Sequence, residues 1–254
     1  MKHALITAGS KGLGKQVTEA FIKKGYSVTV SYRSDYASVL RLREELGIDE
    51  KQLFAVQADV TNREDVISLI QQAIERFGRL DVLVNNAGPY IFERKKLYDY
   101  EPSEWHAMIE GNLSSMFYLL KEALPIMRKQ RYGRIIAYGF QDVGNAPAWL
   151  YRSAYGAAKA GLASLIKSVA VEEAEYGITA NMVCPGKIVG DMKEASIETG
   201  KTHQDDETPV GRPGTGGDIA RTVMFLADEH ADLVTGAIIE VTGGVDVLHQ
   251  NRHE

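Results

Sequence analysis

Short runs of apolar and β-branched residues alternate with longer segments from one end of the chain to the other. The short runs have the composition of buried strands, and the longer segments repeat their apolar residues at helical spacing. The pattern predicts seven strands, at 3–7, 27–32, 53–57, 82–85, 134–138, 179–183 and 237–241. It predicts six helices, at 14–24, 37–46, 63–77, 103–128, 153–176 and 218–227.

This alternation of strands and helices indicates the fold class. Strands joined through a helix pair in parallel, and the helices then cover both faces of the sheet. We therefore predict an α/β protein, a doubly wound three-layer sandwich with a seven-stranded parallel sheet. No repeat, low-complexity tract or linker divides the chain, so residues 1–254 are expected to form a single domain.

One segment breaks the regular pattern. Residues 186–214 are rich in glycine and polar residues and are too long for an ordinary connection between two elements. We expect a flexible substrate lid there, with a short helix near 191–198. The C-terminal sequence LHQNRHE has two histidines, but we expect a solvated end and predict no metal site.

Composition excludes several classes of partner and location. A formal net charge of −5 provides no overall basic field, so neither nucleic acid nor an anionic membrane is expected to bind. The single cysteine, Cys184, cannot form an internal disulfide, and no apolar secretory signal follows Met1. The longest apolar stretches fall well short of a membrane span. We therefore expect a cytoplasmic protein.

A glycine-rich loop joins the first predicted strand to the first helix. Its sequence, TAGSKGLGK, places Gly9, Gly12 and Gly14 where the helix begins. Glycines there let the backbone approach a pyrophosphate closely, and the helix N-terminus offers unpaired amides and a partial positive charge. The loop predicts a dinucleotide site, although a short glycine motif alone also fits a plain strand-to-helix turn.

The end of the second predicted strand indicates which dinucleotide is bound. An NAD site has a carboxylate there for the ribose hydroxyls. The sequence VTVSYRSD instead has Arg33 after the strand, and its first acid, Asp35, comes later. Arg33 and Lys11 could bind a 2′-phosphate, because arginine presents a planar fork of donors that suits phosphate. We predict NADP(H) as the cofactor, with two solvated surface cations as the alternative.

Seven motifs occur in one order along nearly the whole chain: TAGSKGLG, ADV at 58–60, NNAG at 85–88, Asn112, YGAAK at 155–159, NMVCPG at 181–186 and TPVGRPGTGGDIA at 208–220. Each is weak alone, but together they resemble the short-chain dehydrogenase/reductase family. The segments PVGRPG and TGAIIEVTGG make the chain most similar to the 3-oxoacyl-[acyl carrier protein] reductases. The resemblance implies a Rossmann fold and NADPH-dependent reduction of a small-molecule or carrier-bound carbonyl. It also implies a place in fatty acid biosynthesis and assembly as a homodimer or homotetramer.

The resemblance further implies which residues contact the cofactor. Asp59 and Val60 would lie at its adenine end, the NNAG segment at the adenosine ribose, and Pro185, Gly186 and Ile188 at the nicotinamide. The complete set of predicted cofactor residues is Thr7, Gly9, Ser10, Lys11, Gly12, Leu13, Gly14, Arg33, Asp59, Val60, Asn86, Ala87, Gly88, Tyr155, Lys159, Pro185, Gly186 and Ile188.

Tyr155 and Lys159 are four residues apart on a predicted helix and therefore share one face. A nearby ammonium together with an oxidised nicotinamide would favour the phenolate and bring proton transfer by tyrosine closer to neutral pH. In the mechanism that the resemblance implies, Tyr155 protonates the carbonyl oxygen while a hydride adds to the carbonyl carbon. Lys159 would also hold the nicotinamide ribose, and Asn112 would anchor a water that links Lys159 to solvent.

The chain departs from the family where a catalytic serine is expected. Counted forward from GRII, that position is Phe140, which has no donor for a carbonyl oxygen. Losing one such donor costs about 2.7–4 kcal/mol, or roughly a hundred- to a thousandfold in rate. Counted back from Tyr155, the position is Asp142, which must be protonated to donate. Gln141 donates without that cost, so we predict it as the replacement and keep Asp142 as the alternative.

Other positions near this site also differ from the family. The hydroxyls of Tyr138 and Ser153 are weaker candidates for the missing donor. Ala8 stands where the glycine loop usually starts with glycine, and Gly190 stands where a threonine often contacts the cofactor. The second change brings closure of the lid over the cofactor into question.

Two other functions remain open. Pterin reductases of this family are similar in their NADPH preference, in an aspartate at the serine position and in an aromatic residue after NNA, roles that Asp142 and Tyr90 could fill. A non-catalytic NADP-binding sensor would explain Phe140 as a sign of lost chemistry, although the predicted catalytic tyrosine and lysine are retained.

Overall fold

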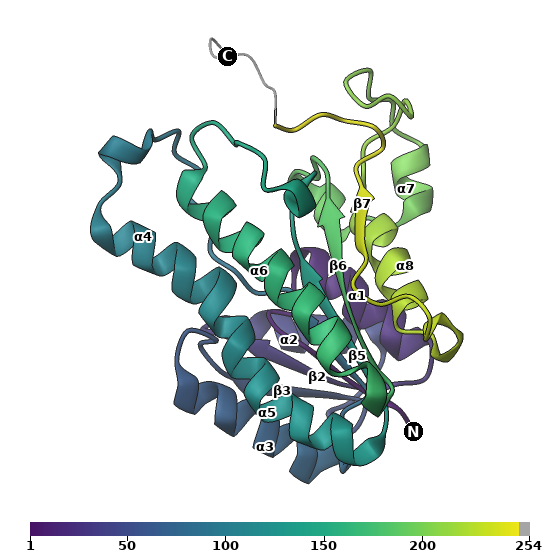
Figure 1. The fold of residues 1–254 in the computed structure, drawn as a ribbon. Helices are drawn as coiled ribbons and strands as arrows, with labels where there is room; N and C mark the ends of the chain where they lie inside the picture. The colour runs from purple at the N-terminus through teal and green to yellow at the C-terminus, as the bar shows by residue number, and fades with distance from the viewer. Residues whose placement is uncertain (249–254) are drawn as a thin grey trace.

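A central sheet of seven parallel strands organises the protein, whose residues 1–248 are described by a computed structural model (Figure 1). The strands lie in the order β3-β2-β1-β4-β5-β6-β7, and every neighbouring pair is parallel. Their bounds are β1 His3–Ile6, β2 Ser27–Tyr32, β3 Leu53–Gln57, β4 Val82–Asn85, β5 Gly133–Tyr138, β6 Ile178–Pro185 and β7 Ile238–Val241. The predicted doubly wound fold is confirmed.

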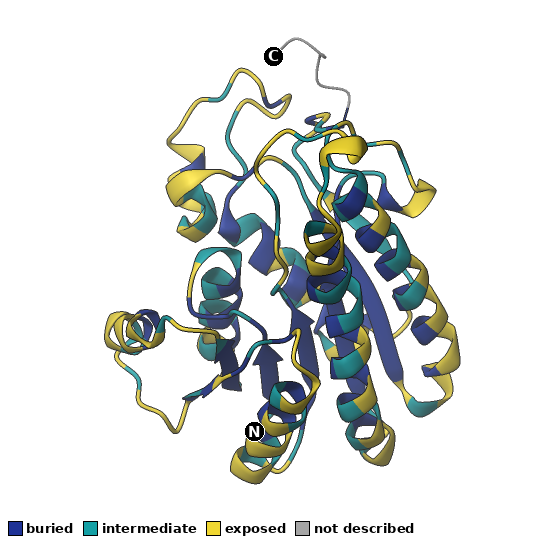
Figure 2. Ribbon diagram, turned by 90° about the vertical axis from the view of Figure 1, so that its left-hand side faces the viewer, coloured by how far each residue is buried: buried dark blue, intermediate teal, exposed yellow. Residues whose placement is uncertain are grey.

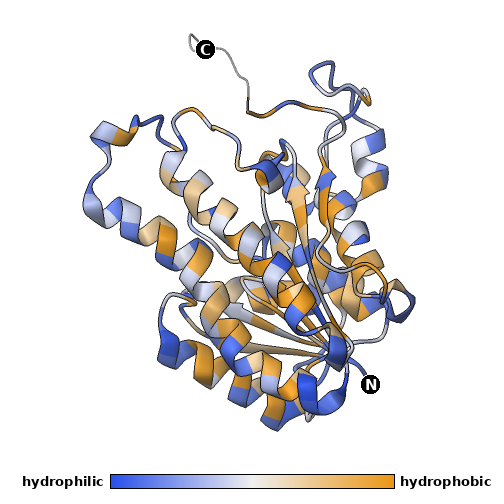
Figure 3. Ribbon diagram, viewed as in Figure 1, coloured by the Kyte–Doolittle hydropathy of each residue, from blue (hydrophilic) through white to orange (hydrophobic). Residues whose placement is uncertain are grey.

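Helices form a layer on each face of this sheet (Figures 2 and 3). On one face, α1, α2 and α8 bury side chains such as Phe21 and Val223, and on the other, α3, α5 and α6 bury side chains such as Leu69 and Leu119. The α-helices are α1 Gly12–Lys23, α2 Tyr36–Leu46, α3 Arg63–Phe77, α4 Pro102–Ile109, α5 Ser115–Gln130, α6 Ser153–Glu172, α7 Ile197–Lys201 and α8 Gly216–Leu226. The short 3-10 turns are η1 Leu97–Asp99, η3 Val143–Asn145, η4 Ala174–Tyr176, η5 Gly190–Glu194 and η6 Glu229–Ala231.

The strand order places the predicted motifs along one edge of the sheet. The chain runs outward from β1 to β3 and then returns to the centre as β4, so the order reverses between β1 and β4. Ligands of open α/β sheets bind in the crevice at the carboxyl ends of the strands beside such a switch point. The glycine loop follows β1, the NNAG segment begins at the last residue of β4, and Pro185 is the last residue of β6, so all three lie at this edge.

The helix predicted at 103–128 is not continuous. A π-helical turn, η2 Glu110–Ser114, separates α4 from α5. A Cβ on Gly111 would collide with the ring of Pro89, so this turn packs directly against the loop that follows β4. The wider turn carries Asn112, and π turns occur often at functional sites.

The predicted lid, 186–214, contains two short helical pieces where one was predicted at 191–198. The turn η5 ends before α7 begins, because Ser196 is extended and its Oγ accepts the Thr199 amide at 3.1 Å. Such a cap starts a new helix instead of continuing the old one.

No helix within residues 1–248 is long and apolar enough to cross a membrane. Within the same range, no three His, Cys, Asp or Glu side chains come together in a way that could hold a metal ion. The two histidines of the C-terminal sequence, His249 and His253, lie outside the described residues.

Candidate active site

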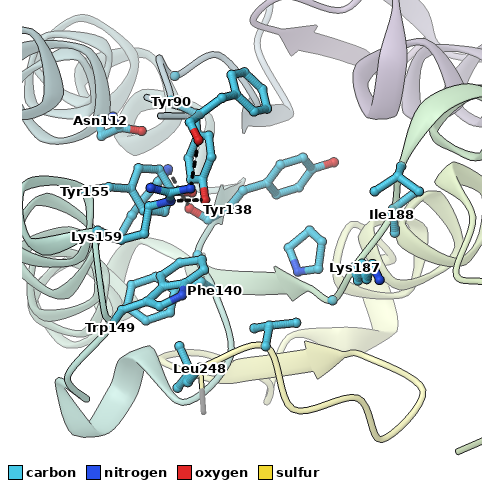
Figure 4. Close-up of a pocket in the computed structure, with 18 of the residues that line it drawn as sticks. Tyr90, Asn112, Tyr138, Phe140, Trp149, Tyr155, Lys159, Lys187, Ile188 and Leu248 are labelled. Atoms are coloured by element: carbon cyan, nitrogen blue, oxygen red, sulfur yellow. Dashed lines mark hydrogen bonds between the residues drawn. The ribbon is translucent and has the colours of Figure 1, made fainter. Parts of the chain in front are cut away.

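A cavity of about 610 Å³ opens at the edge of the sheet where β1, β4, β5 and β6 end (Figure 4). Three of the predicted catalytic residues, Tyr155, Lys159 and Asn112, line it. The predicted cofactor residues that line it are Leu13, Asn86, Gly88, Tyr155, Lys159, Pro185, Gly186 and Ile188. The other predicted cofactor residues follow the carboxyl ends of β1 to β4 outside this cavity.

Tyr155 and Lys159 lie one turn apart near the start of α6. Lys159 is only 5% exposed, and its Nζ donates a hydrogen bond to the backbone carbonyl of Tyr138 at 2.8 Å. The same Nζ lies 5.7 Å from the centroid of the Tyr155 ring. The helix therefore presents a phenol and an ammonium side by side to one space.

Burial changes the protonation of both groups. It raises the pKa of the Tyr155 phenol above 10.0, its ordinary value, and it lowers the pKa of Lys159 to about 8. The predicted phenolate requires an oxidised nicotinamide beside the ammonium; in the protein alone, burial and the neighbouring Tyr90 and Cys184 raise the pKa of the phenol. Tyr155 is therefore neutral near pH 7, which is the form that can donate a proton.

The π turn places the carboxamide of Asn112 against the cavity. Its Nδ2 donates to the carbonyls of Pro89 at 3.0 Å and Met108 at 3.1 Å. Its Oδ1 is buried and has no hydrogen-bond partner among residues 1–248. A buried acceptor without a partner is costly, so we expect a water or a ligand group to bind there.

The glycine loop packs tightly at the start of α1. A Cβ on Gly14 would lie 2.5 Å from the carbonyl oxygen of Ala8 and 2.6 Å from Nδ2 of Asn86, so only glycine fits without a shift. Ala8 has a φ of 50°, in the left-handed region that glycine favours, and its amide donates to Oγ of Ser31 at 3.1 Å. The departure from glycine at position 8 therefore strains the loop by about 1–2 kcal/mol and leaves the turn in place.

Polar side chains tie the end of β1 to the end of β4. Oγ1 of Thr7 accepts the amides of Asn86 at 3.0 Å and Ala87 at 2.8 Å, and it donates to Oδ1 of Asn85 at 3.1 Å. Nδ2 of Asn86 donates to the carbonyls of Thr7 at 3.0 Å and Ala8 at 3.1 Å. This network sets the spacing between the glycine loop and the NNAG segment.

The two cations predicted to bind a 2′-phosphate are both exposed at this end of the sheet. Nζ of Lys11 lies 3.5 Å from Oδ2 of Asp35, and the two side chains are 65% and 39% exposed, so their attraction is weak. A phosphate would compete with this weak pair at Lys11 and with the Asp59 carboxylate near Arg33. Oγ of Ser10 is buried 2.7 Å from Oγ of Ser38, beside the start of α2.

The residues predicted for the adenine end follow β3. Burial alone would raise the pKa of the Asp59 carboxyl, but hydrogen bonds from Thr61 and the charge of Arg33 lower it. The carboxylate accepts the amide and the hydroxyl of Thr61 at 3.0 and 2.7 Å. Val60 is 8% exposed and packs in the core.

The wall that faces Tyr155 across the cavity comes from β6 and the lid (Figure 4). It is formed by Pro185, Gly186 and Ile188, and the Ile188 side chain is 8% exposed. Gly190 follows with a φ of 53°, so a threonine in this backbone conformation would be strained. These three residues offer an apolar surface that suits a flat ring, beside Lys187, which also lines the cavity.

A lid carboxylate that we did not predict contacts the glycine loop. Oε1 of Glu194 accepts the amide of Gly12 at 2.7 Å, and Oε2 lies 3.2 Å from Nζ of Lys15. The backbone carbonyl of Glu194 accepts Nε2 of Gln16 at 3.0 Å. An anion at a helix N-terminus is favourable, so this contact holds η5 against α1.

An aromatic cluster occupies the place of the family's serine. Phe140 is 3% exposed, and its ring centroid lies 4.8 Å from that of Trp149 and 6.1 Å from that of Tyr155. Tyr90 lies edge-on to Tyr155, with the ring centroids 5.0 Å apart. The phenol of Tyr155 therefore lies among rings, with no donor from position 140.

The structure does not bring the predicted replacement donor to the cavity. Oε1 of Gln141 accepts the amide of Val247 at 2.7 Å, and Gln141 is not among the lining residues. The amide of Asp142 donates to Oε1 of Glu240 at 2.6 Å, and its Oδ1 accepts Nδ2 of Asn145 at 2.5 Å. The strand has already ended here, and the left-handed backbone of Asp142, with a φ of 60°, begins η3 on the β7 side. Gln141 therefore anchors the C-terminal segment, which corrects our prediction that it faces the substrate.

The two weaker donor candidates differ from each other. The Ser153 hydroxyl is buried without a partner among the described residues, but it does not line the cavity. The Tyr138 hydroxyl is likewise buried and unpartnered, and Tyr138 does line the cavity.

The loop before α6 contributes an unpredicted clamp. Nε of Arg152 donates to the hydroxyl of Tyr90 at 2.5 Å, and its other nitrogens donate to the carbonyls of Phe92, Glu93 and Tyr151 at 2.8–3.1 Å. The guanidinium thereby joins the loop after β4 to the start of α6. The two counts to the serine position disagree by two residues, which is consistent with an insertion in the loop before Tyr155.

The C-terminal segment and several basic side chains complete the lining of the cavity. Val247 and Leu248 line it from the end of the described chain. Among the lining residues that the structure describes, none is acidic. The basic residues that line it are Arg94, Arg152, Lys159, Lys187 and Lys193. Such a cavity favours anionic ligands.

Comparison with known proteins assigns the chain to a family of enzymes. The family model described as "Enoyl-(Acyl carrier protein) reductase" matches residues 7–246. The chain belongs to the short-chain dehydrogenase/reductase family and is an oxidoreductase.

Individual relatives span the whole length of the chain. A provisionally named oxidoreductase of Bacillus subtilis, YtkK, is 61% identical over 99% of both chains. The 3-oxoacyl-[acyl-carrier-protein] reductase FabG of Staphylococcus aureus is 38% identical, over 96% of this chain and 98% of its own length. The solved structure of a variant actinorhodin polyketide ketoreductase with NADPH is similar, with a TM-score of 0.83, 27% identity and coverage of 96% and 97% of the two chains.

Proposed function

We propose that this chain is an NADPH-dependent carbonyl reductase whose substrates are 3-oxoacyl thioesters, either small or attached to a carrier protein. One observation carries the proposal: a phenol kept neutral by burial, Tyr155, lies beside the Lys159 ammonium in a cavity that begins at the glycine loop. The similarity to FabG supports the substrate class, and the neighbour solved with NADPH supports the cofactor.

The residues around the cavity fit a nicotinamide dinucleotide. The tight turn at Gly14 brings the first turn of α1 to the edge of the sheet, where a pyrophosphate would displace the Glu194 carboxylate from the amide of Gly12. Two buried polar atoms at the cavity, Oδ1 of Asn112 and the hydroxyl of Tyr138, have no partner within residues 1–248 and can receive a ligand. Lys11 and Arg33 provide cations for the 2′-phosphate. When bound, the reduced nicotinamide supplies a hydride.

The chain's own residues handle the proton. Tyr155 donates its phenolic proton to the carbonyl oxygen, and the adjacent Lys159 ammonium stabilises the phenolate that remains. The rings of Tyr90 and Trp149 cover the phenol and exclude water from it. Phe140 adds no donor, so the carbonyl is polarised by Tyr155 alone. We expect turnover roughly a hundred- to a thousandfold slower than with a serine in place.

Pterin reduction is a second, weaker proposal. The ring of Tyr90, 5.0 Å from that of Tyr155, could stack on a flat ligand. The aspartate that the pterin hypothesis requires, Asp142, is instead bonded to Asn145 outside the cavity. A non-catalytic sensor is a third possibility, which the retained pair of Tyr155 and Lys159 disfavours.

One assay separates these proposals. Oxidation of NADPH by the wild-type protein is followed by absorbance with acetoacetyl thioester, crotonyl thioester, dihydropterin or no substrate. We expect turnover with acetoacetyl thioester and much less with NADH in place of NADPH. Turnover of crotonyl thioester alone would indicate reduction of a carbon–carbon double bond, and turnover of dihydropterin alone would favour the pterin hypothesis. No turnover of any compound, together with tight NADPH binding, would favour the sensor.

We also propose a cytoplasmic homodimer or homotetramer that serves in fatty acid biosynthesis. Phe117 on α5 and Val171 on α6 are 52% and 79% exposed, although both are apolar. They lie on the two helices that commonly form the interfaces of related reductases. Light scattering tests the assembly: a monomeric mass at micromolar concentration would contradict it.

A further inference from the structure

The hydroxyl of Tyr138 is a polar group for which the proposed chemistry has no use. Tyr138 is the last residue of β5 and is 7% exposed, and it lines the cavity. Its hydroxyl is buried without a hydrogen-bond partner among residues 1–248. Burial also raises the pKa of this phenol above 10.0, so it is a neutral donor.

The ring of Tyr138 is directed away from the proton-donating side of the cavity. Figure 4 shows it extending from the strand end toward Ile188, while Tyr155 and Phe140 lie on the other side. The packing agrees, because Tyr138 and Ile188 belong to one cluster of the core and Phe140 belongs to the other. The unpartnered hydroxyl therefore does not face the place where Tyr155 protonates a carbonyl.

Hydride transfer requires the nicotinamide on the side where Tyr138 points. Reacting atoms must come within about 3–3.5 Å of each other, with the carbonyl oxygen at Tyr155. The ring that carries the hydride would then lie between the substrate and the wall formed by Pro185, Gly186 and Ile188. Its carboxamide is the one polar group that a nicotinamide ring presents to such a wall.

We infer that the hydroxyl of Tyr138 donates a hydrogen bond to the carboxamide of the nicotinamide and fixes the orientation of that ring. The inference rests on the proposed function. A fixed carboxamide prevents the ring from turning over and presents one face to the substrate. Tyr138 is thus a cofactor-positioning residue, distinct from the proton donor Tyr155.

The test compares the whole cofactor with the half that lacks a nicotinamide. Dissociation constants for NADPH and for 2′,5′-ADP are measured by calorimetry on the wild type and on Tyr138→Phe, which keeps the ring and removes only the hydroxyl. We expect NADPH binding to weaken about three- to tenfold, the worth of one hydrogen bond, and 2′,5′-ADP binding to stay unchanged. Tyr176→Phe, at η4 outside the cavity, is the matched control and should change neither constant.

Three results would overturn the inference. The first is an unchanged dissociation constant for NADPH in Tyr138→Phe. The second is an equal loss of affinity for NADPH and for 2′,5′-ADP. The third is a fall in kcat on acetoacetyl thioester with unaltered NADPH binding. The last would make the hydroxyl a donor to the substrate. Thermal unfolding without ligand checks the fold, and Tyr138→Phe should be at least as stable as the wild type, because it removes an unpaired buried hydroxyl. If the wild type does not bind NADPH, the proposed function and the inference both fail. If the wild type reduces acetoacetyl thioester and Tyr138→Phe binds NADPH with the wild-type dissociation constant, the inference alone fails.

Discussion

The glycine-loop end and the substrate end of the cavity are built differently. At the first, Thr7 and Asn86 bond the ends of β1 and β4 together, and Gly14 fits only because it has no side chain. At the second, Phe140 replaces a donor, and loops clamped by Arg152 form the walls. We therefore expect the strand ends to fix the geometry of the cofactor, and the loops to set the choice of substrate and the rate.

Phe140→Ser tests the substrate end with the largest expected gain. A hydroxyl at position 140 should raise kcat on acetoacetyl thioester about ten- to a hundredfold, somewhat less than a preorganised donor is worth. Phe140→Ala is the control, because it removes the same packing against Trp149 without adding a donor, and both variants should lose about 3–5 kcal/mol of stability. Equal rates for the two variants would show that position 140 does not limit the reaction.

Gly14→Ala tests the cofactor end. The added Cβ must push against the carbonyl of Ala8 and Nδ2 of Asn86, so NADPH affinity should fall more than about tenfold, with a stability loss of about 1–3 kcal/mol. Calorimetry and chemical denaturation measure the two effects. Gly156→Ala on α6 is the control, since a Cβ there meets no atom within 4 Å. NADPH binding by Gly14→Ala at wild-type affinity would contradict the tight fit of the loop.

The pH dependence reports on Lys159. Because its pKa is about 8, kcat/KM for carbonyl reduction should be level below pH 8 and fall about tenfold per unit above it, and Lys159→Met should lack this fall. Stability should change in the opposite sense. In the unfolded chain the pKa of Lys159 is near 10.5. Between pH 8 and 10.5 the lysine therefore keeps its proton in the unfolded chain and loses it in the folded protein, so the free energy of unfolding rises with pH. A level rate profile through pH 9 would show that the ammonium charge is not needed.

Gln141→Ala has the smallest expected effect and distinguishes an anchor from a donor. Loss of its bond to the Val247 amide should loosen the wall formed by Val247 and Leu248. The KM for acetoacetyl thioester should rise about three- to tenfold with kcat nearly unchanged, as one hydrogen bond is lost. A fall in kcat of about a hundredfold at constant KM would instead restore Gln141 as the donor to the carbonyl.

The fold could be predicted because each strand and helix is indicated by residues that are close together along the chain. Strands buried on both faces appear as continuous apolar runs, and β2, β3 and β4 begin and end at the predicted residues. The shared face of Tyr155 and Lys159 follows from helical spacing alone. In both cases the sequence neighbours of a residue determine its environment.

The features that the sequence did not predict depend on contacts between segments that are far apart along the chain. In the π turn Gly111 packs against Pro89, a contact between distant segments, while the apolar spacing through 103–128 continues as in an ordinary helix. Gln141 was predicted as the donor because its amide needs no protonation, but its position is set by Val247, a partner 106 residues away that local spacing does not reveal. The raised pKa of Tyr155 arises from burial, which no pair of neighbouring residues indicates.

The proton donor is the centre of the proposed chemistry, and Tyr155→Phe tests it most directly. The substitution removes one oxygen and keeps the ring that packs against Tyr90 and Trp149. We expect kcat on acetoacetyl thioester to fall at least about a hundredfold, while the dissociation constant for NADPH changes less than about threefold. Turnover at the wild-type rate by a Tyr155→Phe variant that binds NADPH normally would contradict the assignment of Tyr155 as the acid.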